Sequence, residues 1–132
     1  SIQDVPVCGQ SYAFLAGRPL TLQELARHPI ISLGPQSKTF EFYSRIFLDS
    51  GLTFAPDIEA ATSAQILPLV KSDLGIGFIP EDFVEGGAEQ QGLYVLTLCN
   101  PVPLRSICLL EREGHSLSIA AKEFKRMLPR QQ

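Results

Sequence analysis

The sequence predicts an α/β fold in which an open, mostly parallel sheet carries helices on both faces. Between residues 30 and 79, short apolar segments of strand length alternate with segments of helical periodicity. That alternation is typical of parallel sheets whose strands are joined by helices. The chain has 132 residues, of which 45% are hydrophobic, so it is large enough to bury the core of one domain.

A capping box marks the first helix. Thr21 and Glu24 have its spacing, so we expect a short helix from Leu22. The helix ends before Pro29, because the residue that precedes a proline avoids the helical conformation. Around this helix we expect strands at residues 5–8 and 30–33 and an irregular linker at residues 10–18.

The rest of the chain continues the alternation. We expect, in order, a helix from Lys38 or Thr39 to Ser50, a strand at 56–61, a helix at 64–72, a strand at 75–79, a helical turn at 81–84, strands at 93–98 and 104–110, and a last helix from near Ser116 or Ser118. Gly51 fits the left-handed residue that follows a helix. Pro68 removes a backbone hydrogen bond from its helix, which must therefore start late or bend.

Composition disfavours several classes of protein. The formal net charge is −3 and the cations are scattered, whereas a nucleic-acid surface needs clustered positive charge. The odd cysteine count (Cys8, Cys99 and Cys108) and the absence of metal-ligand spacing favour a reduced, cytoplasmic setting with no metal. No apolar run is long enough to span a bilayer.

The sequence indicates no catalytic residues and no cofactor. His28 and His115 do not lie beside an evident nucleophile, and no G-x-S-x-G motif is present. Gly75 and Gly77 lack the third glycine of a dinucleotide-binding loop and lie within a strand. They are better explained by a tight turn and the close approach of a helix.

Polar side chains gather at two predicted helix starts. Ser37, Lys38 and Thr39 open the first long helix, and Thr62 and Ser63 open the next one. In a parallel sheet, both starts lie at the edge where ligands bind. Hydroxyl groups, backbone N–H groups and one lysine suit a small anion. For each hydroxyl taken alone, capping of the helix is the commoner role, and only the convergence of the two starts favours binding.

Three segments of the chain resemble the effector-binding domain of LysR-type transcriptional regulators. They are LAGRPLTLQELARHPIISLGPQSKT, FLDSGLTFAPDIEAATSAQILPLVKSDLGIGFIPEDF and SLSIAAKEF. The most specific part is the order S-G-L, P-x-x-x-x-A-T-S and L-V-x-x-x-L-G-I-G-x-x-P between Ser50 and Pro80.

The resemblance implies a periplasmic-binding-protein-like fold of two α/β subdomains with an effector between them. Residues 1–132 would be part of that unit. Residues 1–19 would be a crossover strand and linker, residues 20–113 the second subdomain, and residues 114–132 a helix that returns to the first subdomain. It also implies that Ser37, Lys38, Thr39 and Thr62 lie where effectors bind, with Ser63 beside them.

The resulting hypothesis is the ligand-sensing domain of a bacterial, cytoplasmic, homo-oligomeric regulator. It would bind a small effector, and it would reach DNA only through a helix-turn-helix outside this chain. Two alternatives stay open on sequence alone: a lobe of a periplasmic solute-binding protein, and an enzyme of the same two-lobed architecture.

Overall fold

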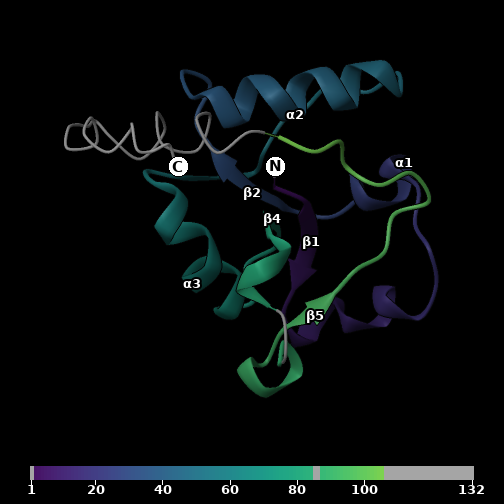
Figure 1. Ribbon diagram of the computed structural model, residues 1–132, viewed down its shortest axis with the longest axis vertical. Helices are drawn as coiled ribbons and strands as arrows, with labels where there is room; N and C mark the ends of the chain where they lie inside the picture. The colour runs from purple at the N-terminus through teal and green to yellow at the C-terminus, as the bar shows by residue number, and fades with distance from the viewer. Residues whose placement is uncertain (1, 85–86, 106–132) are drawn as a thin grey trace.

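The computed structural model describes residues 2–84 and 87–105, which form a five-stranded mixed sheet with helices on both faces (Figure 1). The strands lie in the order β3-β2-β4-β1-β5. Their bounds are Asp4–Cys8 for β1, Ile30–Leu33 for β2, Ile58–Ala60 for β3, Ile76–Pro80 for β4 and Tyr94–Val95 for β5.

The parallel part of the sheet consists of β3, β2 and β4. Strand β2 pairs in parallel with both neighbours, and Ile31 lies opposite Ile58 on one side and Gly77 on the other. Strand β1 runs antiparallel to β4 and β5. No helical crossover joins β1 to a sheet neighbour, so nothing requires it to run parallel. The predicted α/β class is confirmed, with an antiparallel edge added to the parallel strands.

Local signals set the helices. Helix α1 (Leu22–Leu25) begins at the predicted capping box, in which Thr21 Oγ1 accepts from the Glu24 N–H at 3.1 Å and Glu24 Oε1 accepts from the Thr21 N–H at 3.0 Å. Helix α2 spans Lys38–Asp49. Gly51 follows it with φ of +79°, as the sequence predicts.

The α-helix between β3 and β4 begins later than predicted, because a 3-10 turn comes before it. A 3-10 turn, η2 (Ser63–Gln65), precedes helix α3 (Ile66–Lys71). The late start places Pro68 in the first turn of α3, where the proline costs no intrahelical hydrogen bond. Of the two outcomes expected for this proline, the late start is the one observed.

Several predicted bounds differ from the structure. Residues 10–18 were predicted as an irregular linker, but Gln10–Gly17 forms the 3-10 helix η1. The strand at 93–98 is reduced to β5, and the turn at 81–84 is the 3-10 helix η3 (Glu81–Phe83), followed by η4 (Glu89–Gln91). In the predicted strand at 104–110, Arg105 pairs with Ile2. The rest of that strand and the predicted last helix lie outside the described residues.

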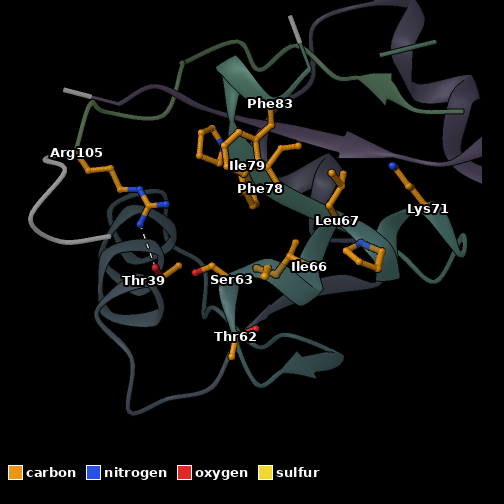
Figure 2. Close-up of a pocket in the computed structure, with 13 residues that line it drawn as sticks. Thr39, Thr62, Ser63, Ile66, Leu67, Lys71, Phe78, Ile79, Phe83 and Arg105 are labelled. Carbon is orange, nitrogen blue, oxygen red and sulfur yellow. Dashed lines mark hydrogen bonds between the residues drawn. The ribbon is translucent and has the colours of Figure 1, made fainter. Parts of the chain in front are cut away.

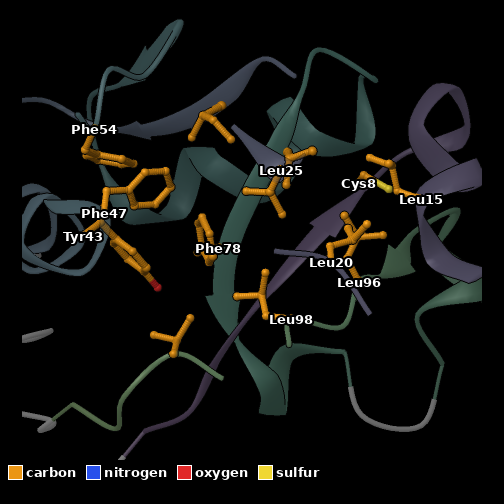
Figure 3. Close-up of a cluster of buried hydrophobic side chains, with 13 residues drawn as sticks. Cys8, Leu15, Leu20, Leu25, Tyr43, Phe47, Phe54, Phe78, Leu96 and Leu98 are labelled. Atoms are coloured by element: carbon orange, nitrogen blue, oxygen red, sulfur yellow. The ribbon is translucent and has the colours of Figure 1, made fainter. Parts of the chain in front are cut away.

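Two apolar clusters cover the two faces of the sheet. Phe78 of β4 packs on the α2 side, where its ring centre lies 4.5 Å from that of Tyr43 (Figure 3). The next residue, Ile79, belongs to the cluster on the α3 side together with Val70. This alternation follows from the two-residue period of a strand, and it confirms that helices lie on both faces.

Helix α3 lies so close to β4 that no side chain fits between them at Gly77. A β-carbon at this position would lie 2.8 Å from methyl carbons of Ile66 and Val70. The structure thus confirms the expected close approach of a helix at this glycine.

Among the described residues, no helix is both long and apolar enough to cross a membrane.

Gly77→Ala is expected to lower the free energy of unfolding by about 1–3 kcal/mol, because an added methyl group overpacks this contact. Urea unfolding of both forms measures the change. Gly17→Ala is the matched control, since a β-carbon there meets nothing within 4 Å. Equal stability of the two variants would show that the α3–β4 contact is looser than described.

Candidate functional site

A pocket of about 830 Å³ lies at the carboxyl ends of the parallel strands. Strands β2 and β3 run in parallel, so α2 and η2, which follow them, both begin at this edge of the sheet. Figure 2 shows side chains from these two elements, from α3 and from β4 around the pocket. The lining residues are Thr39, Thr62, Ser63, Ala64, Ile66, Leu67, Pro68, Lys71, Phe78, Ile79, Pro80, Phe83 and Arg105.

Thr39 is the buried polar residue that α2 contributes to this pocket. It lies in the first turn of the helix and is 5% exposed. Its hydroxyl oxygen accepts a hydrogen bond from Arg105 Nη1 at 3.0 Å (Figure 2). Both residues of this hydrogen bond line the pocket.

Arg105 is held by an ion pair and an aromatic ring. Its Nη2 lies 3.0 Å from Asp4 Oδ2, and neither side chain is more than 5% exposed. The Tyr43 hydroxyl donates a hydrogen bond to the same carboxylate oxygen. The Arg105 guanidinium also lies 5.4 Å from the centre of the Phe42 ring. These contacts fix the position of the guanidinium, and through it the position of the Thr39 hydroxyl.

Thr62 and Ser63 line the same pocket, and Figure 2 shows the Ser63 side chain beside that of Thr39. Both are exposed, and Thr62 precedes η2 without using its side chain as a cap. The turn is held instead by Gln65, whose Oε1 accepts from the Ala61 N–H at 2.9 Å. The Thr62 hydroxyl therefore does not have the capping role that is commoner for a single hydroxyl at a helix start.

Ser37 and Lys38 do not line the pocket. Ser37 caps α2, because its Oγ accepts from the Phe40 N–H at 3.0 Å and donates to the Gly34 carbonyl at 2.9 Å. The Lys38 ammonium is exposed and lies 3.8 Å from Glu41 Oε1. The structure thus brings Thr39, Thr62 and Ser63 together and leaves Ser37 and Lys38 outside.

Sequence reasoning missed Arg105 and the apolar wall of the pocket. Arg105 contacts Thr39 from a distant part of the chain, and its backbone pairs with Ile2. The one local signal is a single charge within the apolar segment VPLRSICLL. Phe83 and Leu67 were predicted simply as parts of helical segments, yet both line the pocket.

The described cysteines and the described histidine do not line this pocket. Burial, and secondarily the Asp73 carboxylate, raises the pKa of the Cys8 thiol to about 11, so the thiol is neutral near pH 7. Cys99 is exposed, and His28 packs edge-on against the rings of Tyr12 and Phe14. Within residues 2–84 and 87–105, no group of three His, Cys, Asp or Glu residues could hold a metal ion.

Comparison with known families identifies the family to which the chain belongs. The sequence profile of the family described as LysR substrate binding domain matches residues 2–132. The chain belongs to this family. The match confirms the resemblance seen in the sequence, and it favours a LysR domain over a lobe of a periplasmic solute-binding protein. Among curated proteins, no significant match was found.

Solved structures of LysR effector domains share the fold. The effector-binding domain of QuiR in complex with shikimate is 19% identical, with a TM-score of 0.64, and the match covers 95% of this chain and 58% of that one. The Synechocystis PCC6803 CcmR regulatory domain in complex with 2-PG is 15% identical, with a TM-score of 0.64, and the match covers 96% and 61%.

The chain spans only part of these relatives. HinK, a LysR family transcriptional regulator from Pseudomonas aeruginosa, is 17% identical with a TM-score of 0.59, and the match covers 76% of this chain but 35% of HinK. The chain therefore spans about a third of that regulator and about three fifths of the two effector domains.

Asp4→Ala is expected to lower the free energy of unfolding by about 3–5 kcal/mol, because it leaves the Arg105 charge buried without its carboxylate. The midpoint and slope of urea unfolding measure this. Glu41→Gln removes the exposed pair with Lys38 and should change little, since such pairs contribute little. A small effect of Asp4→Ala would show that the guanidinium is solvated.

Proposed function

We propose that this chain is the ligand-sensing part of a bacterial LysR-type transcription regulator and that a small, anionic effector binds in the 830 Å³ pocket. The observation that carries the proposal is the meeting of Thr39, Thr62 and Ser63 at one pocket end, beside the carboxyl ends of parallel strands. Hydroxyl groups at such an edge can donate to an anion. QuiR with shikimate and CcmR with 2-PG are relatives that hold small molecules.

In the whole regulator, residues 20–113 would form the second of two subdomains and residues 1–19 would lead into it. Residues 114–132 would return to the first subdomain. An effector between the subdomains shifts their arrangement only as far as it binds one arrangement more tightly than the other. That shift reaches DNA through a helix-turn-helix outside this chain.

The proposed protein acts without catalysis and without a cofactor, as a homo-oligomer in the cytoplasm. The pocket supports a binding role, because its polar side chains are hydroxyl groups and cations rather than a base paired with a nucleophile. The buried, neutral Cys8 thiol supports the same assignment.

A thermal-shift screen of small organic and inorganic anions against the full chain is expected to find at least one that raises its melting temperature. Thr62→Ala should weaken binding of that anion severalfold, because an exposed hydroxyl that makes no capping bond is lost from the pocket rim. Isothermal titration calorimetry measures the change.

Thr53→Ala is the matched control, since Thr53 is exposed and does not line the pocket. Binding that is equally strong in both variants would place the effector elsewhere. Turnover of the bound anion would contradict a purely sensory role.

A further inference from the structure

A second cavity, of about 370 Å³, is lined by β1 and by the chain that follows β5. Its origin is the loss of pairing along β1. The Leu96 N–H donates to the Pro6 carbonyl at 2.8 Å, but Pro6 has no N–H to return a bond. The chain then leaves β1, because Leu98 pairs with Leu20 instead. This divergence leaves a hollow beside the first half of β1.

The ionisable side chains among the described residues that line this cavity are two carboxylates, Asp4 and Glu81. Glu81 is exposed and makes no salt bridge within the described part of the chain. The Asp4 side chain is 0% exposed, and only its Oδ2 atom pairs with Arg105. Asp4 Oδ1 is buried and accepts no hydrogen bond from the described residues.

A buried carboxylate oxygen without a donor costs free energy, so this cavity favours an occupant that donates hydrogen bonds. The rest of the wall favours an apolar body, because Val5, Val95, Leu96 and Val102 contribute to it. Its volume lies at the lower end of the range of about 300–1,000 Å³ that small-molecule sites occupy.

We propose that this cavity is a second binding site, for a small primary ammonium ion with an alkyl or ring body. The ammonium donates to the Glu81 carboxylate and to Asp4 Oδ1, and the body packs on Val5 and Val95. The site differs from the 830 Å³ pocket in its location and in the charge that it takes. It therefore does not depend on the proposed effector.

The two cavities are connected by one ion pair. Asp4 lines the smaller cavity and Arg105 lines the larger pocket, and the contact between Asp4 Oδ2 and Arg105 Nη2 is 3.0 Å. An ammonium beside Asp4 competes with the guanidinium for the same carboxylate. This competition is stronger in the interior than at the surface, because the dielectric constant is lower there. Occupation of the second site thus changes how firmly Arg105 is held beside the larger pocket.

Calorimetric titration of the full chain with three probes tests the site. Cyclohexylmethylammonium has both features, cyclohexylmethanol keeps the ring without the charge, and methylammonium keeps the charge without the ring. The first probe should bind at least about tenfold more tightly than either of the others, since both features contribute.

Glu81→Gln should weaken binding of cyclohexylmethylammonium severalfold, because the rim loses its charge. Asp82→Asn is the matched control, since the neighbouring Asp82 is equally exposed and does not line the cavity. Val95→Asn gives an independent readout on the apolar wall. It should weaken binding of both cyclohexyl compounds and leave the ratio between them unchanged.

The connection to Arg105 has its own readout. In ¹⁵N-edited NMR spectra, the Arg105 Nε–H signal should shift as cyclohexylmethylammonium is added and stay in place with cyclohexylmethanol. Thr62→Ala, a change in the larger pocket, should leave the affinity for the ammonium unchanged.

Four results would overturn the inference. The alcohol could bind as tightly as the ammonium, Asp82→Asn could weaken binding as much as Glu81→Gln, or Thr62→Ala could abolish binding. If none of the probes binds, water rather than an amine satisfies Asp4 Oδ1. Binding that leaves the Arg105 signal in place would contradict the link through the ion pair. All of these results are independent of whether an anion binds in the larger pocket.

Discussion

The buried ion pair between Asp4 and Arg105 joins the two ends of the described chain. Its 3.0 Å contact ties β1 to a residue whose backbone also pairs with Ile2, through hydrogen bonds of 2.7 and 2.9 Å. Such a pair is expensive to bury, because both ions lose their hydration. The cost is offset by further hydrogen bonds: the Tyr43 hydroxyl donates to the carboxylate, and the Thr39 hydroxyl oxygen accepts from the guanidinium. The pair thus fixes the Arg105 guanidinium and, through it, the Thr39 hydroxyl at one end of the pocket.

The location of the pocket follows from chain topology. Parallel pairing of β2 with β3 and β4 brings the segments that follow these strands to one edge of the sheet. Helix α2 then covers one face and α3 the other, so a hollow is left between their starts. Gly77 lets α3 lie directly on β4, and this contact helps to place Ile66 and Leu67 in the pocket wall.

Local rules predicted the local features well. The capping box at Thr21, the left-handed Gly51 and the late helix start at Pro68 depend on neighbours a few positions away, and the structure has all three. The same logic found two helix starts but could not separate Ser37, which caps α2, from Thr39, which faces Arg105. That distinction depends on Arg105, a partner 66 positions from Thr39, and no short-range pattern encodes such a contact.

Arg105 gives the pocket a physical connection to the Ile2–Arg105 bridge. Its side chain lines the pocket and its backbone forms the bridge, so one residue belongs to both. Packed protein interiors do not deform gradually. A small change at one buried contact is therefore transmitted as a shift between discrete arrangements of the packed elements. A ligand contributes to that shift only by the difference in its affinity for the two arrangements. A ligand that contacts Arg105 can supply such a difference, because this residue lines the pocket and also forms the bridge.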